Sequence, residues 1–84
     1  MLNIIIADDH LVVRKGLVQF LNESFPGEYI EEVVDAKSLL KKVLKKTWDL
    51  VISDISMPGT SGLDVLHEIK QHCPRLPVLI LSMY

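Results

Sequence analysis

The sequence predicts one α/β domain with a doubly wound parallel sheet, in which helices pack on both faces. Short apolar segments alternate with amphipathic helical segments in the order βαβαβαβ, which is typical of parallel sheets. The chain has 84 residues, enough for one small domain. Hydrophobic residues make up 49% of it, a share that favours a packed core over disorder. Because crossovers between parallel strands are right-handed, few strand orders remain possible.

Three segments are almost wholly apolar, as strands covered on both faces should be. They span residues 2–7, 49–53 and 77–82. A fourth candidate, residues 29–35, carries Glu31 and Glu32 within it. This mixed polarity predicts an edge strand.

Three helices are predicted from apolar residues that recur at helical spacing. The stripes are Val13, Leu17, Phe20 and Leu21; Leu39, Leu40, Val43 and Leu44; and Leu63, Leu66 and Ile69. Lys41, Lys42, Lys45 and Lys46 are expected on the solvated side of the second helix. Ser61 is a candidate cap for the third helix, and Trp48 is expected to anchor the segment before the third strand.

Composition excludes several classes of protein. The net charge is −2, with acids and bases spread along the chain, so neither a nucleic-acid-binding field nor a polybasic membrane patch is expected. The single cysteine, Cys73, cannot form an intrachain disulfide. No apolar run approaches the roughly 20 residues of a membrane span, and the N-terminus does not resemble a signal peptide. The cytoplasm is the expected location.

Acidic residues follow two of the apolar strands. Asp8 and Asp9 come directly after the first strand, and Asp54 comes directly after the third. Parallel strands place their carboxyl ends at one edge of the sheet, where open α/β sheets bind ligands. If the first and third strands are neighbours, about 4.8 Å apart, the three carboxylates converge in one crevice.

Such a cluster favours a hard cation, because three nearby carboxylates repel one another unless their charge is offset. Mg²⁺ prefers oxygen ligands and commonly binds one or two carboxylates together with phosphate oxygens. A site of this kind suits phosphoryl transfer, in which a carboxylate can act as the nucleophile. The competing interpretation is structural, since a lone Asp after a strand is commonly a turn former, and Asp9 could cap the first helix.

The motifs then resemble a known family, the receiver domains of bacterial two-component response regulators. The resemblance is carried by Asp8-Asp9-His10, Asp54, Met57-Pro58, Gly62 and Ser82, in register over four strands and the whole chain. Ala7 to His10, Val13 to Leu17, Asp54 to Gly59, Ser61 to Asp64 and Leu81 to Tyr84 resemble the NarL/FixJ type in particular. The family's fold is flavodoxin-like, with strand order 2-1-3-4-5. This order is what the resemblance implies.

The resemblance implies a role for each matching residue. Asp54 would accept a phosphoryl group from a histidine kinase, and Mg²⁺ would be held by Asp8, Asp9, Asp54 and the backbone carbonyl of Ser56. Ser82 would be the switch hydroxyl that turns toward the phosphoryl group. Met57, Pro58 and Gly59 would shape the loop beside the acceptor. His10 is expected to start a helix and His67 and His72 to face solvent, without a phosphoryl-carrying role.

The resemblance also implies parts that residues 1–84 do not contain. Receivers carry a lysine and an aromatic switch residue at a fifth strand, followed by further helices, and all of these would lie beyond Tyr84. We therefore expect residues 1–84 to be a partial receiver domain, with DNA binding left to an absent output domain. The exposed edge of the fourth strand would be covered by a partner or by exchanged elements, so a homo-oligomer is expected.

Three alternatives remain open at this stage. A Mg²⁺-dependent phosphohydrolase would also use Asp54 as nucleophile, but its usual general acid two residues later is replaced here by Ser56. A flavin-binding module would need backbone donors for its phosphate, which Asp8 and Asp9 would repel. A receiver-like module that is never phosphorylated and serves only protein contacts is the third alternative. A signalling domain without turnover of its own is the leading hypothesis.

Overall fold

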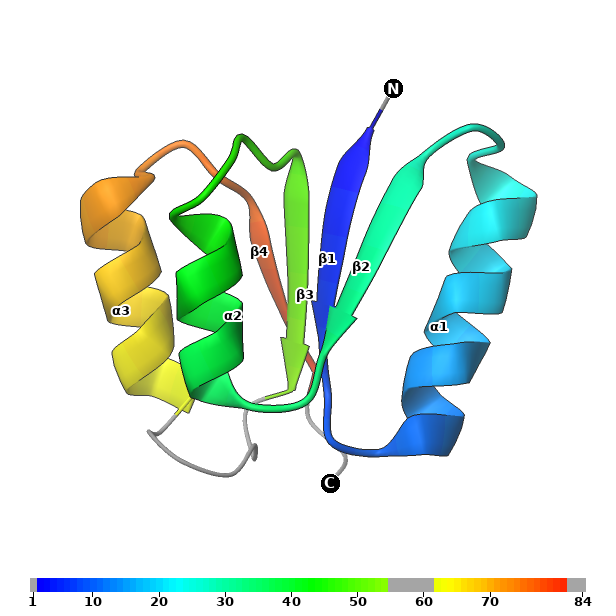
Figure 1. Cartoon of the computed structure of the whole chain (residues 1–84), viewed down its shortest axis with the longest axis horizontal. Helices are drawn as coiled ribbons and strands as arrows, with labels where there is room; N and C mark the ends of the chain where they lie inside the picture. The colour runs from blue at the N-terminus through cyan, green and yellow to red at the C-terminus, as the bar shows by residue number, and fades with distance from the viewer. Residues whose placement is uncertain (1, 55–61, 82–84) are drawn as a thin grey trace.

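A computed structural model describes residues 2–54 and 62–81 of the chain, with four strands and three helices in alternation (Figure 1). The elements are β1 (Asn3–Ala7), α1 (Leu11–Ser24), β2 (Tyr29–Val33), α2 (Ala36–Val43), β3 (Leu50–Asp54), α3 (Gly62–His72) and β4 (Val78–Leu81). The order βαβαβαβ confirms the prediction.

All four strands are parallel and form one sheet in the order β2-β1-β3-β4. This is the doubly wound, flavodoxin-like order that was expected. The acidic strand β2 lies at the edge of the sheet, as its mixed polarity predicted. In Figure 1 the four arrows point the same way, so their carboxyl ends share one edge of the sheet.

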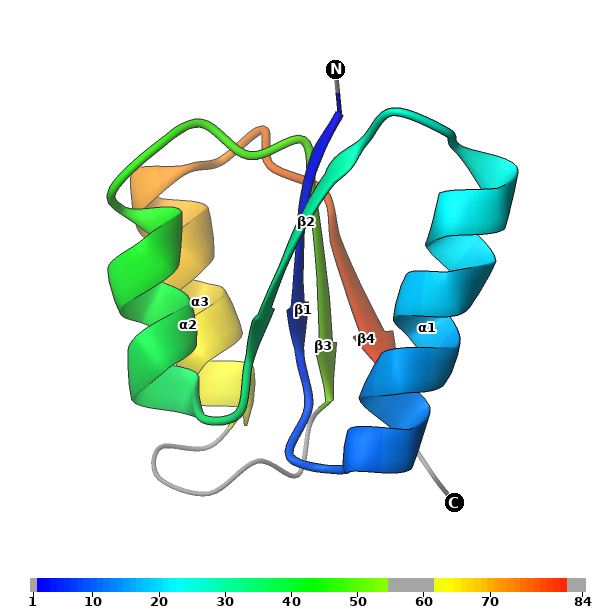
Figure 2. The ribbon, with the colours of Figure 1, turned by 45° about the vertical axis from the view of Figure 1, so that its right-hand side comes forward.

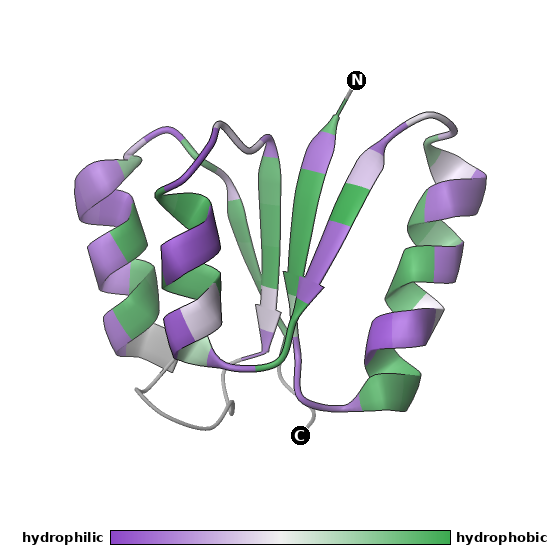
Figure 3. Ribbon diagram, in the orientation of Figure 1, coloured by the Kyte–Doolittle hydropathy of each residue, from purple (hydrophilic) through white to green (hydrophobic). Residues whose placement is uncertain are grey.

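The sheet separates two apolar layers, because successive residues of β1 point to opposite faces. Ile5 and Val51 pack on one face beneath α2 and α3, with Leu39 and Ile69 from those helices. On the other face α1 covers a second cluster made of Ile4, Ile6, Leu21 and Ile52. Figure 2 shows the sheet between the helix layers, and Figure 3 shows apolar strands with the apolar sides of the helices turned toward them.

Helix α2 has well-defined ends. The Asp35 carboxylate accepts a 2.7 Å hydrogen bond from the backbone N–H of Ser38, which is the usual N-cap geometry. Because this bond favours the ionised form, the pKa of Asp35 lies below its ordinary value. The helix ends at Val43, so Lys45 and Lys46 belong to the following turn and not to the helix. Trp48 anchors that turn, with its indole N–H donating to the Lys42 carbonyl at 2.9 Å.

Two apolar residues assigned to buried stripes proved to be exposed. Phe20 is 62% exposed, because the buried side of α1 is centred on Leu21 and includes Val18, and Phe20 lies about 100° around the helix from Leu21. Leu44 is 50% exposed and is the C-cap residue that follows α2. The predicted stripes of α1 and α2 were therefore correct except for one residue in each.

Within residues 2–54 and 62–81, none of the helices has the length and apolar character required to cross a lipid bilayer.

Candidate functional site

The pairing of β1 with β3 brings two acidic residues to the same level of the sheet. Ala7 is the register partner of Ser53. The next residue after Ala7 is Asp8, and the next after Ser53 is Asp54. Both acids therefore sit side by side at the carboxyl edge of the two central strands, where the sequence predicted them.

The acids differ in exposure. The side chains of Asp8 and Asp54 are each only 1% exposed, whereas that of Asp9 is 32% exposed. Asp8 is fixed by a 3.1 Å hydrogen bond from its backbone N–H to the Val33 carbonyl of β2. Two buried carboxylates and one at the mouth thus form a small acidic crevice that opens to solvent on the Asp9 side.

His10 completes this cluster. Ligand atoms of Asp8, Asp9, His10 and Asp54 all lie within 4.8 Å of one another. The His10 Nδ1 atom is 2.9 Å from Asp8 Oδ1, 3.1 Å from Asp9 Oδ1 and 3.5 Å from Asp54 Oδ2. One imidazole nitrogen therefore faces all three carboxylates.

The acids alter the basicity of this imidazole. The hydrogen bond to Asp8, followed by the negative charge of Asp9, raises the pKa of His10 above its ordinary value. As the sequence predicted, His10 also starts a helix, because it is the N-cap of α1. Its backbone N–H donates to Asp8 Oδ1 at 2.8 Å, so the residue is tied to the crevice by two bonds to one carboxylate.

Arg14 supports the crevice from the first turns of α1. Its Nη1 donates to the Asp8 backbone carbonyl at 2.9 Å, and its Nε donates to Glu32 Oε1 of β2 at 3.0 Å. The Arg14 side chain is only 13% exposed. Lys15 reaches the other oxygen of Glu32 at 3.1 Å but is 59% exposed. Arg14 therefore joins the loop after β1 to the edge strand, while Lys15 adds only a surface ion pair.

Replacement of Arg14 by alanine should lower the free energy of unfolding by about 1–3 kcal/mol, because two hydrogen bonds from a largely buried cation are lost. Arg14→Lys should recover less than half of this, since an ammonium group cannot reproduce the fork of a guanidinium. Lys15→Ala is the matched control, and a surface pair of this kind contributes less than about 1 kcal/mol. Urea denaturation would measure all three variants. Equal losses of stability at Arg14 and Lys15 would contradict the proposed role of Arg14 in joining the loop after β1 to the edge strand.

The structure brings together three of the predicted site residues, Asp8, Asp9 and Asp54, in one pocket. The other predicted residues, namely Ser56, Met57, Pro58, Gly59 and Ser82, lie outside the described residues, as does the candidate cap Ser61. His67 and His72 are exposed on α3, as expected.

Sequence reasoning missed two contributors, the His10 imidazole and Arg14. A usable signal was present for Arg14, because it lies four residues after His10 and therefore on the same side of α1. The backbone N–H of Arg14 does donate to the His10 carbonyl at 3.0 Å, which closes the first turn of the helix.

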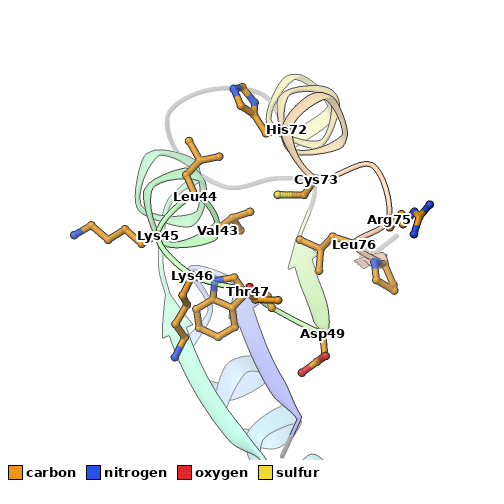
Figure 4. Close-up of a pocket in the computed structure, with 12 residues that line it drawn as sticks. Val43, Leu44, Lys45, Lys46, Thr47, Asp49, His72, Cys73, Arg75 and Leu76 are labelled. Atoms are coloured by element: carbon orange, nitrogen blue, oxygen red, sulfur yellow. The ribbon is translucent and has the colours of Figure 1, made fainter.

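A pocket among the described residues lies away from these acids. It is formed where α2 and α3 end and the chain turns into β3 and β4 (Figure 4). Lys45, Lys46, His72 and Arg75 line it, and basic residues near helix C-termini are common because they offset the helix dipole. Its one carboxylate, Asp49, already accepts a 2.7 Å hydrogen bond from the Asn3 backbone N–H. This pocket has no cluster of acids and is not the candidate site.

Comparison with known proteins places the whole arrangement in a family. Residues 4–84 match the response regulator receiver domain. The chain is 39% identical over 84 residues to the oxygen regulatory protein NreC of Staphylococcus haemolyticus, with 99% of this chain and 39% of that protein covered. It is 36% identical over 81 residues to the transcriptional activator protein ExaE of Pseudomonas putida, with 96% and 38% covered. The chain thus spans about four tenths of the length of these relatives.

Solved structures agree with these relatives. The response regulator protein TrrA of Thermotoga maritima, solved in complex with Mg²⁺ and BeF, superposes with a TM-score of 0.91 at 36% identity. The superposition covers 100% of this chain and 71% of TrrA. TrrA has also been solved in complex with the histidine kinase ThkA, and that copy gives a TM-score of 0.89. The resemblance to the NarL/FixJ type is confirmed by NreC and ExaE. With this sheet order, this acidic crevice and these relatives, the chain belongs to the response regulator receiver domain family.

Proposed function

We propose that the chain is a phosphoryl-accepting switch, in which the Asp54 carboxylate receives a phosphoryl group beside a divalent cation. The observation that carries this proposal is the register of β1 against β3, which sets Asp8 and Asp54 side by side. Residues 1–84 would supply the acid-bearing part of a receiver domain. Receiver domains are signalling domains, so the product is a changed conformation and not a released metabolite.

The crevice fits a hard cation on its own chemistry. Among the described residues, Asp8 Oδ2 is buried and has no hydrogen-bond partner, an arrangement that is costly unless an ion or water engages it. Asp8, Asp9 and Asp54 would hold Mg²⁺, which favours oxygen ligands. The Ser56 carbonyl remains a further proposed ligand from the sequence. When bound, Mg²⁺ would offset the negative charge of a phosphoryl group that approaches three acids.

The transfer itself needs one bond exchange. An Asp54 oxygen attacks phosphorus, a new O–P bond forms, and the bond from phosphorus to the donor breaks with its electron pair left on the donor. The donor is a phosphohistidine nitrogen of a kinase, or the acyl oxygen of a small acyl phosphate. The burial of Asp54 limits access of water to the aspartyl phosphate, which would slow its hydrolysis.

Partners follow from the relatives. TrrA forms a complex with a histidine kinase, and ExaE is a transcriptional activator. We therefore propose that a cytoplasmic histidine kinase phosphorylates this domain, and that the added charge regulates a transcriptional output domain of the parent protein. Ser82 would act as the switch hydroxyl and Met57, Pro58 and Gly59 would shape the acceptor loop. Association of two receiver copies is part of the same proposal.

A phosphohydrolase is the less favoured function. Multiple turnover would need an acid to protonate the leaving group, and the residue two positions after Asp54 is Ser56. Asp8 and Asp9 would bind the cation in this proposal, so neither would serve as that acid. We therefore propose that the domain assists its own phosphorylation without independent turnover.

The test is to incubate the chain with Mg²⁺ and acetyl phosphate and to measure the intact mass. One phosphoryl group should be gained, and Asp54→Asn should abolish the gain, because an amide is not a nucleophile of this kind. A second readout is ¹⁹F NMR with beryllium and fluoride, which needs no bond breakage. Wild type with Mg²⁺ should show a bound fluoride signal and Asp54→Asn should not.

Asp64→Asn is the matched control, since Asp64 is an exposed acid in the first turn of α3. This variant should behave like wild type in both measurements. A mass gain that persists in Asp54→Asn would rule out Asp54 as acceptor. Wild-type chain that shows neither a mass gain nor a bound fluoride signal would overturn the proposed function for residues 1–84.

A further inference from the structure

The His10 Nδ1 atom has more close carboxylate contacts than one hydrogen bond can account for. A protonated Nδ1 directs its hydrogen along one line, and Asp8 Oδ1 lies at 2.9 Å to receive it. Asp9 Oδ1 and Asp54 Oδ2 approach the same nitrogen to 3.1 Å and 3.5 Å. One hydrogen can point at only one of three oxygens, so a hydrogen bond accounts for only one of the three contacts.

These separations are those of atoms that share one metal ion. Two ligand atoms that each lie about 2.1 Å from an ion are about 3.0 Å apart at a right angle and about 3.4 Å apart at a tetrahedral angle. The three contacts of His10 Nδ1 run from 2.9 to 3.5 Å. An ion bound among the carboxylates could therefore engage Nδ1 with little movement of the ring.

We propose that His10 Nδ1 is a fourth ligand of the acidic crevice, and that it turns the site toward first-row divalent transition ions such as Co²⁺ or Zn²⁺. The inference rests on the proposed function, because it uses the same three carboxylates. It goes beyond that function by assigning a nitrogen ligand and a metal preference to this chain.

Ligand chemistry gives the direction of the preference. Mg²⁺ selects oxygen ligands and retains several waters. Imidazole nitrogen suits the borderline ions, whose affinity for a mixed N,O site exceeds that of hard ions. A neutral imidazole that replaces one water therefore strengthens the binding of a transition ion much more than that of Mg²⁺.

Two structural features prepare His10 for this role. Its backbone N–H donates to Asp8 Oδ1, which fixes the residue beside the crevice before any ion binds. The ring itself is 55% exposed and makes no capping bond to α1. The ring can therefore adjust to an ion without a cost to the helix.

The experiment is isothermal titration calorimetry of the full 84-residue chain with cobalt chloride and, separately, with magnesium chloride, for wild type and His10→Ala. Loss of even an outer-shell partner of a metal commonly costs about 10–100-fold in affinity, so loss of a direct ligand should weaken Co²⁺ binding by about tenfold or more. Mg²⁺ affinity should change by less than about threefold, because its oxygen ligands remain. His72→Ala is the control, since His72 lies on α3 with Nδ1 bonded to the Glu68 carbonyl.

A second measurement needs no variant. In wild type, Co²⁺ should strongly shift or broaden the ring resonances of His10 in proton NMR, while those of His67 and His72 stay in place. Equal Co²⁺ affinity in wild type and His10→Ala, or an equal loss for both ions, overturns the inference while leaving the proposed function intact. Failure of wild type to bind either ion overturns both.

Discussion

Replacement of Leu39 by alanine is expected to lower the free energy of unfolding by about 3 kcal/mol, within the range measured for buried leucines. Leu39 is 1% exposed and lies in the larger apolar cluster, between α2 and the sheet. A domain of this size has only about 4–13 kcal/mol of stability in total. The variant should therefore lose a large share of its stability, because the cavity lies where two layers meet.

Leu44→Ala is the matched control, since Leu44 caps the same helix but is 50% exposed. This variant should lose only about 0.5 kcal/mol of unfolding free energy. Urea denaturation followed by fluorescence measures both, because Trp48 is the only tryptophan and is 6% exposed. Equal losses of stability at both positions would show that Leu39 does not contribute to the core between α2 and the sheet.

The fold could be predicted because its signals are local and strong. Strands β1 and β3 are apolar on both faces, which only a doubly covered sheet explains. The charged pair Glu31 and Glu32 correctly indicated an edge position for β2. The order of the strands was not predictable in the same way, because it depends on long-range pairing, and it came from the resemblance to receiver domains.

The rotation of α1 could be predicted only in part from its apolar residues. Leu17 and Leu21 of the predicted stripe do pack toward the sheet, but Phe20 is exposed and Val18 packs there instead. Arg14 also lies on the inward side, because its guanidinium has hydrogen-bond partners in the Asp8 carbonyl and Glu32. A polar residue that is satisfied by the fold thus helps to set the helix rotation, and no hydropathy pattern contains this information.

The candidate site was predictable in part: the meeting of its acids was, but the position of His10 was not. Asp8 and Asp54 follow the ends of adjacent parallel strands, so their meeting is a consequence of sheet geometry. The entry of His10 depends on the backbone turn between β1 and α1, where the residue has φ −96° and ψ 109°. That extended conformation places its backbone N–H and its ring on the same Asp8 oxygen, which strand and helix periods do not determine.

Asp54→Asn is expected to have opposite effects on stability with and without a divalent cation. In a chelator the variant should be more stable than wild type by about 1 kcal/mol. Carboxylate oxygens of the crevice lie within 4.8 Å of one another, and two unit charges at that separation repel by about 3 kcal/mol at an effective permittivity of about 20. His10 offsets part of this repulsion, so the net gain is smaller.

With Mg²⁺ at about 100 times its dissociation constant, wild type should gain about 2.7 kcal/mol, because an ion that binds only the folded state stabilises it by mass action. Asp54→Asn should gain far less, since it has lost a charged ligand from the centre of the crevice, and the order of the two stabilities should therefore reverse. Urea denaturation of both proteins in EDTA and in Mg²⁺ measures the four values, with Asp64→Asn expected to follow wild type throughout. The same carboxylates that destabilise the empty crevice are those that make it a cation site, so a variant that gained as much from Mg²⁺ as wild type would place the ion elsewhere.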